Sequence, residues 1–362
     1  MTEDLGRQVF EDLRHTSQHD YLGEIKDLYH FYLDDERRTK LDNMGRFKRA
    51  FLLLGWIFKS LLLDLSPPRR MMLLISLILV WVLGTTTFTF QNRLISADLY
   101  HWGYLLILLV LMLELKDKLL AKDEINTARE VQLALLPRAH PDIPGWDVWS
   151  FSRPANSVGG DLFDYIELDG FRHGILLGDV AGKGLGAALL TAKLQATLRA
   201  LVPNAVSLDE LAKQMNRILY RDGLDNRFAT LFYAELEHNS GQVRYLNAGH
   251  NPALVLGKDR FQRLESSSFP VGLMEDVTYE EGAVTMEPGE MLFAYTDGLS
   301  EAMNTAGEEY GVERVEALAR DLLEMDPTAA GKHALKAINR FLGDARPDDD
   351  LSLMILVRQE QS

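Results

Sequence analysis

The chain has 362 residues, of which 47% are hydrophobic, so it can hold two or three folded units. Its formal net charge of −15 at pH 7 argues against a nucleic-acid partner, because nucleic acids are bound through clustered lysine and arginine. The absence of cysteine excludes disulfides, thiolate metal sites and cysteine nucleophiles. Any chemistry must therefore depend on carboxylates, histidines and hydroxyl groups.

Residues 1–66 are predicted to form a helical N-terminal region, and the chain start lacks the basic and apolar segments of a signal peptide. Near the end of this region, Arg46–Leu65 mixes basic side chains with phenylalanine, leucine and tryptophan. This pattern fits two interpretations, a helix lying in the lipid headgroup layer or a helix packed on its neighbours. Ser66, Pro67 and Pro68 then interrupt the chain.

Two apolar runs follow, and they predict a two-span transmembrane hairpin over residues 67–115. Met71–Phe90 has 20 residues without a charge and would reach roughly 30 Å as a helix, the thickness of the hydrocarbon core. Leu99–Leu115 is shorter, but the aromatic residues near its start match a membrane interface. Two buried core helices are the alternative interpretation.

Basic residues flank this hairpin on both sides, with Arg69 and Arg70 before it and Lys116, Lys118 and Lys122 after it. Because positive charges are retained on the cytoplasmic side, both ends of the hairpin are expected in the cytoplasm. The predicted location is the cytoplasmic membrane, as a multi-pass protein in contact with membrane lipid. The C-terminal part of the chain is expected in the cytoplasm.

Residues 116–140 are predicted to form a linker helix, since Lys116–Leu136 contains no glycine or proline and Pro137 follows. One side of this helix carries an apolar seam with a single polar member. The seam favours either a short two-stranded coiled coil, and hence a homodimer, or docking of the helix on its own domain. Its members are Ile125, Ala128, Gln132 and Leu135.

Residues 141–362 change to short β-like runs separated by turn signals such as Leu168-Asp169-Gly170, with helical patterns between some of them. Several β-like runs follow one another directly, so antiparallel hairpins should dominate. Helices packed on the faces of such sheets give an α/β sandwich in the α+β class. The region preceding it, with its membrane-associated segments, is expected to be all-α.

The stretch ILLGDVAGKGLGAALLTAKL, residues 175–194, has the strand, glycine-rich turn and helix of a phosphate-binding loop. Its Gly182-Lys183 pair lacks the glycine expected five positions earlier, where Leu177 stands. The serine or threonine expected next is replaced by Gly184. A nucleotide-binding ATPase or cyclase is therefore disfavoured.

Acidic residues stand instead where apolar strands meet glycines or turns. They are Asp161, Asp179, Asp297 and the run Asp348–Asp350. One such residue alone is usually a turn former or a helix cap. Four sites of this kind in one domain favour a divalent metal site, because hard cations such as Mg²⁺ and Mn²⁺ prefer carboxylate oxygens.

Several motifs then resemble one family in the correct order. They are NSVGGDLFDY, GDVAGKGLGAALL, NAGHNPALVL, PVGL, MLFAYTDGLSEAMN and DDDLSLMIL. Together they are similar to the bacterial SpoIIE/RsbU-type branch of the PPM family of metal-dependent serine/threonine phosphatases, over about Ala128 to Val357. The resemblance implies a PPM-type sandwich of two mainly antiparallel sheets flanked by helices. It also implies a hydrolase with two Mn²⁺ or Mg²⁺ ions.

The resemblance implies a role for each acidic position. Asp179 would bridge both ions, with the Val180 carbonyl on one of them. Asp297 and Asp349 would complete the shell of the second ion, with Asp349 preferred over its neighbours in the DDD run. Asp161 would hold metal-bound waters or bind a metal directly. Two such ions activate a water for in-line attack on a phosphoserine or phosphothreonine, which requires no cysteine nucleophile.

The resulting hypothesis is a membrane-anchored protein serine/threonine phosphatase facing the cytoplasm. By resemblance, its substrate would be a phosphorylated anti-sigma-factor antagonist. The alternative is a non-catalytic signalling scaffold or receptor that uses the phosphatase fold for binding. Lys183 is expected to make a secondary electrostatic contact and His250 to be a structural loop residue, while Arg153 has no assigned role.

Overall fold

The computed structural model describes residues 46–83, 85–90, 93–137, 140–222, 227–238, 240–266 and 268–359. Most of the predicted helical region 1–66 therefore lies outside the described residues. The chain separates into two compact units, Met1–Leu119 and Leu120–Ser362.

The first unit contains the helices α4 (Arg46–Asp64) and α5 (Pro67–Ile78), a π-helical turn Leu79–Leu83 and the first part of α6 (Tyr100–Leu135). Between the π-helical turn and α6, β1 (Thr85–Phe90) and β2 (Arg93–Asp98) form an antiparallel hairpin. This corrects the all-α expectation for the N-terminal region. The sequence Thr-Thr-Thr-Phe-Thr-Phe is uncharged, but β-branched and aromatic residues favour a strand over a helix.

Helices α5 and α6 run antiparallel, with contacts at both ends of α5. Near its start, Arg69 pairs with Glu114 at 2.8 Å and with Asp117 at 2.6 Å. Beyond its end, a Cβ atom built on Gly103 of α6 would overlap the side chain of Val80, so only glycine permits this close approach. Arg70 donates to the carbonyls of Leu62, Leu63 and Leu65, which ties the C-terminal end of α4 to α5.

One described helix is long and apolar enough by composition to cross a membrane, and it is Leu185–Asn204 of the second unit. That segment is a core helix, because its apolar side packs against a β-sheet. Helix α5 and its π-helical turn are short, having 12 and 5 residues. The apolar half of α6 continues directly into a charged half.

The second unit is built on two five-stranded sheets in which all paired neighbours are antiparallel. The first sheet has the order β10 (Glu281–Thr285), β7 (Gln242–Ala248), β6 (Ala229–Glu237), β5 (Arg172–Val180) and β4 (Leu162–Asp169). The second has the order β3 (Trp146–Arg153), β12 (Leu351–Arg358), β11 (Met291–Tyr295), β8 (Ala253–Gly257) and β9 (Arg260–Leu264).

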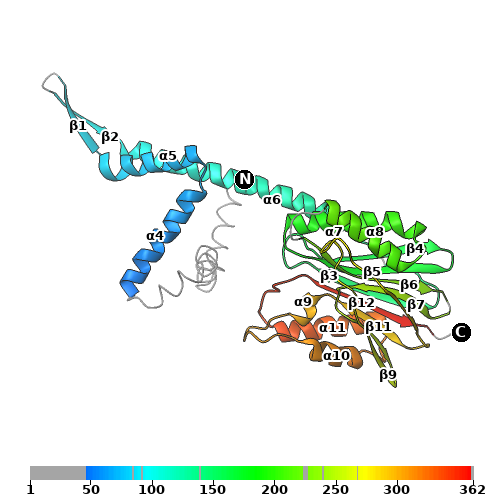
Figure 1. Ribbon diagram of the computed structural model, residues 1–362. Coiled ribbons are helices and arrows are strands. Elements are labelled where there is room, and N and C mark those ends of the chain that lie inside the picture. The colour runs from blue at the N-terminus through cyan, green and yellow to red at the C-terminus, as the bar shows by residue number, and fades with distance from the viewer. Residues whose placement is uncertain are drawn as a thin grey trace, which may run out of the picture. The chain divides into compact units, whose positions relative to one another are not determined.

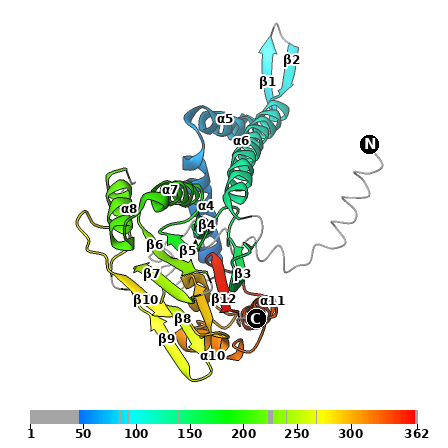
Figure 2. The same ribbon diagram turned by 90° about the vertical axis from the view of Figure 1, so that its right-hand side faces the viewer.

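Helices cover the outer face of each sheet (Figure 1). The first sheet is covered by α7 (Leu185–Leu201) and α8 (Leu208–Asp222), which are joined through the 3-10 turn Val202–Asn204. The second is covered by α10 (Val312–Asp321) and α11 (Pro327–Leu342), and the short α9 (Asp297–Ser300) lies next to β12. The view turned by 90° shows the same layers from the side (Figure 2).

The core consists of three apolar layers, one between the sheets and one under each helical layer. Strand β5 shows how the sequence produces them. Leu176 faces the helices α7 and α8, whereas Ile175 and Leu177 face the other sheet, and all three side chains are fully buried. A strand with both faces buried must be apolar on both, since successive side chains alternate. The predicted α/β sandwich is thus confirmed.

Candidate active site

The acidic residues predicted from sequence come together because three strand ends meet at one edge of the sandwich. Asp179 is the last residue but one of β5. Asp297 lies two residues after the end of β11, and Asp349 lies two residues before the start of β12. Strands β11 and β12 are antiparallel, with Tyr295 opposite Leu353, so the residue after one strand lies beside the residue before the other.

Asp161 reaches this edge through two glycines. A Cβ atom on Gly160 would lie 2.8 Å from the Val180 carbonyl oxygen and 3.1 Å from Asp179 Oδ1, closer than real side chains allow for the first contact. Only glycine therefore lets this loop approach the end of β5. The Val180 amide donates to the Gly160 carbonyl at 3.3 Å, which fixes the loop against the strand.

Asp161 is buried, with 6% of its surface exposed. Its Oδ2 accepts a hydrogen bond from Thr296 Oγ at 2.9 Å, whereas Oδ1 is buried and has no hydrogen-bond partner among the described residues. Burial, followed by the charge of Asp179, raises the pKa of Asp161 well above its usual value. A buried carboxylate oxygen without a partner is costly, so the position suits a cation or a cation's water.

Burial and neighbouring carboxylates raise the pKa values of Asp179 and Asp297. Burial, followed by the charges of Asp297, Asp349 and Asp350, raises the pKa of Asp179 to about 7. Burial, followed by the charge of Asp349, raises the pKa of Asp297. Asp179 therefore occupies the point where the negative potential of the group is concentrated.

Asp349 and Asp350 have different surroundings. Asp350 is buried and its carboxylate accepts hydrogen bonds from the Ala155 amide at 2.7 Å and the Gly160 amide at 2.5 Å. It is thus an anchor for the loop that precedes Asp161. Asp349 is more exposed, and its Oδ2 lies 3.2 Å from Lys183 Nζ. This distribution of contacts favours Asp349 over Asp350 as a metal ligand.

Lys183 also donates to the Asp348 carbonyl at 2.5 Å, so its ammonium group contacts the acidic run at two points. Lys183 lies in a turn between Gly182 and Gly184, whose φ angles of 107° and 75° are in a region that favours glycine. This geometry turns the chain away from Asp179 and brings Lys183 to Asp349. It provides the secondary electrostatic contact expected from the sequence.

The donor set fits hard divalent cations. It consists of carboxylates and the Val180 carbonyl, and it includes neither histidine nor cysteine, which suits Mg²⁺ or Mn²⁺. Within the described ranges, no three acidic or histidine side chains converge tightly enough to chelate one ion directly. Mg²⁺ usually keeps several of its waters, so widely spaced carboxylates are compatible with it.

His250 lies behind the site as a buried residue. Its Nδ1 is 2.8 Å from Thr230 Oγ1, and its amide donates to Asn247 Oδ1 at 2.9 Å. Burial lowers the pKa of His250 to about 4, so the imidazole is neutral at pH 7. A neutral, enclosed imidazole is a structural residue of this loop rather than a proton donor to substrate.

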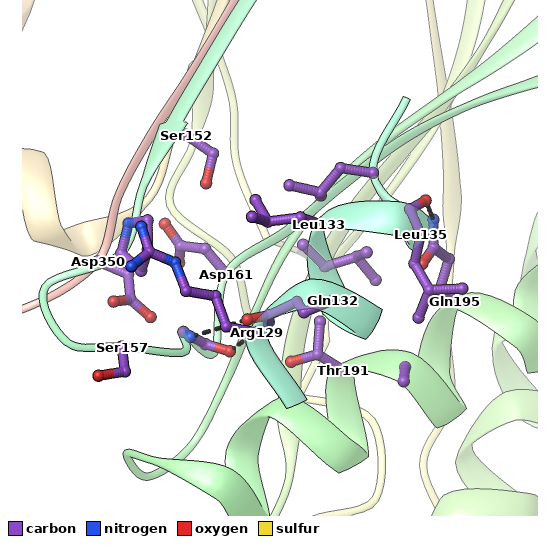
Figure 3. A pocket seen from close by; sticks show the side chains of 15 residues that line it. Arg129, Gln132, Leu133, Leu135, Ser152, Ser157, Asp161, Thr191, Gln195 and Asp350 are labelled. Atoms are coloured by element: carbon purple, nitrogen blue, oxygen red, sulfur yellow. Dashed lines mark hydrogen bonds between the residues drawn. The ribbon is translucent and has the colours of Figure 1, made fainter. Parts of the chain in front are cut away.

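Two polar residues of the site were not expected from the sequence. Thr296 orients Asp161, and its place directly before Asp297 was the available signal. Gln132, near the end of α6, donates from Nε2 to the Gly159 carbonyl at 2.7 Å and accepts from the Gly159 amide at 3.1 Å (Figure 3). Gln195 of α7 donates to the Leu135 carbonyl at 2.9 Å. The end of α6 therefore docks on its own domain.

A small cavity of about 50 Å³ lies beside this contact (Figure 3). Gln132 and Arg129 of α6 line it together with Asp161 and Asp350. The polar seam residue of the linker helix is thus next to the loop that carries the first predicted site residue.

Two stacked antiparallel sheets covered by helices, with carboxylates gathered at one edge, define a PP2C-type phosphatase fold. The SiaA-PP2C domain of Pseudomonas aeruginosa shares it with a TM-score of 0.60 and 20% identity, over 67% of this chain and 99% of that one. Residues 169–359, more than half of the chain, match the family model for Stage II sporulation protein E (SpoIIE). The chain belongs to the SpoIIE family, which confirms the family predicted from its motifs.

Named relatives share the same part of the chain. "Protein IcfG" of Synechocystis sp. is 29% identical over 220 residues, which cover 53% of this chain and 35% of IcfG. "Phosphoserine phosphatase RsbU" of Bacillus subtilis is 27% identical over 243 residues, which cover 66% of this chain and 71% of RsbU. The crystal structure of the RsbU and RsbW domains of Rv1364c from Mycobacterium tuberculosis aligns with a TM-score of 0.53 and 25% identity. That alignment covers 61% of this chain and 62% of the mycobacterial chain. The chain therefore spans only part of the length of IcfG and of the mycobacterial protein.

Proposed function

We propose that the chain is a Mn²⁺- or Mg²⁺-dependent protein serine/threonine phosphatase. The observation that carries this proposal is the meeting of Asp161, Asp179, Asp297 and Asp349 at one edge, where burial and mutual repulsion raise the pKa values of the first three. Such a group of carboxylates is electrostatically unfavourable without cations. Membership of a family that includes named phosphoserine phosphatases supports the same activity.

Each residue has a defined part in this mechanism. Asp179 and the Val180 carbonyl would hold the first ion, and Asp179, Asp297 and Asp349 would hold the second. Asp161 is held by Thr296 and orients water through its free Oδ1. Divalent ions held there would supply an activated water and offset the charge of the phosphoryl oxygens. Lys183 compensates the charge of Asp349 beside the position of the phosphoryl group.

Release of phosphate from a phosphoserine protein and from p-nitrophenyl phosphate, measured with Mn²⁺ and with EDTA, tests this assignment. We expect turnover of both substrates with Mn²⁺ and none with EDTA. Stable binding of the phosphoprotein without phosphate release would favour the scaffold alternative instead. The substrate that we propose by family resemblance is a phosphorylated anti-sigma-factor antagonist.

We further propose that the first unit anchors the chain in the cytoplasmic membrane through α5 and the apolar half of α6. Large apolar side chains are exposed here, with Trp81 at 82% and Val82 at 74% in the π-helical turn after α5, and Trp102 at 63% in α6. Monomeric soluble proteins rarely expose contiguous apolar surface of this kind. The ion pairs of Arg69 with Glu114 and Asp117 then mark the end near the cytoplasm.

The membrane proposal predicts that reporter fusions after Asn92 and after Lys122 lie on opposite sides of the membrane. The full chain should also stay with the membrane pellet after alkaline extraction. Recovery of the full chain as a monodisperse protein without detergent would show that the apolar surface is covered by protein, not lipid.

A homodimer through the linker helix is also proposed. In the part of α6 that belongs to the second unit, Ile125, Val131 and Leu133 are exposed at 36%, 56% and 53%. Of these, Ile125 belongs to the predicted seam and is available for a second copy, while the seam residues Gln132 and Leu135 contact the phosphatase domain.

A further inference from the structure

A groove of about 290 Å³ opens directly beside the proposed metal site. Asp349 lines the groove and is also a proposed metal ligand, and Gly298 follows the proposed ligand Asp297, so a group bound at the metals would lie next to the groove. We call this feature the flanking groove. Its remaining lining comes from the end of β3, the turn before α7, the C-terminal end of α11, the segment after α9 and the run before β12. The principal side chains are Arg153, Lys183, Glu301, Met303, Glu309, Ile338, Leu342 and Pro347.

One wall of the flanking groove is a short loop that its own hydrogen bonds make rigid. Met303 and Glu309 form an isolated antiparallel bridge, so their side chains are neighbours on this wall. The turn between them is closed by Asn304, whose Oδ1 accepts from the Ala306 amide at 2.9 Å and the Glu308 amide at 3.0 Å. A rigid wall of this kind can select a ligand without first being ordered by it.

The flanking groove is lined by charges of both signs, and the charges of Asp297 and Asp349 act on Glu301. Lys183 contacts Asp349. Arg153 is also in the lining, and its Nε is buried without a hydrogen-bond partner in the described part of the chain. Glu301 and Glu309 are exposed, and neither carboxylate makes an ion pair with a described residue. Lys183 suits a phosphate held beside Asp349, and the two glutamates suit a basic side chain.

The apolar part of the lining supplies a second element of recognition. Met303 is 40% exposed beside Glu309, and Ile338 and Leu342 of α11 form the base beneath it. At about 290 Å³ the flanking groove is near the lower end of the roughly 300–1,000 Å³ range of small-ligand sites. It can therefore hold a few side chains of an extended segment but not a folded domain.

We propose that the flanking groove binds the residues next to the phosphoserine of the protein substrate and selects a basic side chain together with an apolar one. This inference rests on the proposed phosphatase function. The phosphoryl group lies at the metals near Lys183. The basic side chain contacts Glu301 and Glu309, and the apolar one packs on Met303. Selectivity then comes from attraction to the basic residue and from repulsion of an acidic residue at the same place.

Phosphoserine peptides that differ at one position test the proposal. One set carries Lys within three residues of the phosphoserine, on either side, and a matched set carries Glu there. With Mn²⁺, we expect at least one Lys peptide to have a kcat/KM about tenfold above its Glu partner, since two exposed charge pairs each contribute a few-fold. The Glu309→Lys variant should reduce or reverse this preference, and Glu309→Gln should reduce it partly.

The Glu324→Lys variant is the matched control, because Glu324 is exposed on the same domain and is not part of the groove. It should keep the preference of the unchanged protein. Turnover of p-nitrophenyl phosphate measures whether the active centre of each variant is intact. If that substrate is turned over but no peptide pair differs, or if Glu309→Lys and Glu324→Lys behave alike, the flanking groove does not select the substrate. Absence of turnover on all substrates by the unchanged protein would overturn the phosphatase function itself.

Discussion

Replacing Asp179 by Asn is expected to abolish phosphatase activity while the catalytic domain stays folded. Asp179 is the residue on which the charges of three other carboxylates act, and it is the proposed ligand of both ions. Loss of a shared ligand removes several kcal/mol of stabilisation from the transition state, so turnover should fall by about 10³-fold or more. Phosphate release in the presence of saturating Mn²⁺ measures this effect. Turnover near that of the unchanged protein would contradict the two-metal assignment.

The same substitution should change how stability depends on pH. In the metal-free protein the pKa of Asp179 is raised from 3.8 to about 7, so between these values the folded state holds a proton that the unfolded state has lost. Stability without metal should therefore fall as pH rises from about 4 to about 7, by at most a few kcal/mol. Asp179→Asn should flatten this dependence, because the amide does not ionise.

Denaturant unfolding between pH 4 and pH 8 in EDTA, repeated with Mn²⁺, measures that dependence. Mn²⁺ should stabilise the unchanged protein at pH 7 and have little effect on Asp179→Asn, since a ligand stabilises only the state that binds it. The matched control is Asp344→Asn, which makes the same chemical change at an exposed position outside the site. Its unfolding profile should follow that of the unchanged protein.

The catalytic domain could be predicted from sequence because its strands carry strong local signals. The run His173–Val180 is apolar on both faces, and it is a central strand buried on both sides. Acidic residues at strand ends indicated the site, because antiparallel pairing brings the ends of β11 and β12 together. In these places the local pattern and the final fold agree.

The errors and omissions have physical causes of their own. Hydropathy predicted one transmembrane helix over Met71–Phe90, because it measures polarity and not strand preference. The residues Thr85–Phe90 favour a strand and form β1. Three adjacent residues of one type cannot be told apart as metal ligands from sequence alone. In the structure, the hydrogen bonds of Asp350 with Ala155 and Gly160 distinguish it from Asp349. The apolar seam on the linker helix has the same sequence pattern whether the helix pairs with a second copy or docks on its own domain. The bonds between Gln132 and Gly159, 27 residues apart, are a tertiary contact that no short pattern contains.

Gln132 connects the linker helix to the loop that ends in Asp161. Its side-chain amide satisfies both the carbonyl and the amide of the buried Gly159. Replacement by Leu keeps the size and helix propensity but leaves these two backbone groups unpaired, at a cost of about 1–3 kcal/mol for each that stays buried. We expect the loop to become less well ordered and the Mn²⁺ concentration for half-maximal activity to rise about tenfold, which corresponds to about 1.4 kcal/mol.

The Gln195→Leu variant separates this effect from a general loosening of the helix. Gln195 also ties α6 to the domain, but through the Leu135 carbonyl and without contact to the Asp161 loop. It should lower thermal stability and leave the Mn²⁺ requirement nearly unchanged. If instead the seam pairs with a second copy, Gln132→Leu should strengthen self-association, because an apolar residue replaces the polar member of a coiled-coil interface. Sedimentation of both variants decides between these outcomes. Stronger association with an unchanged Mn²⁺ requirement would mean that Gln132 faces a partner helix rather than Gly159.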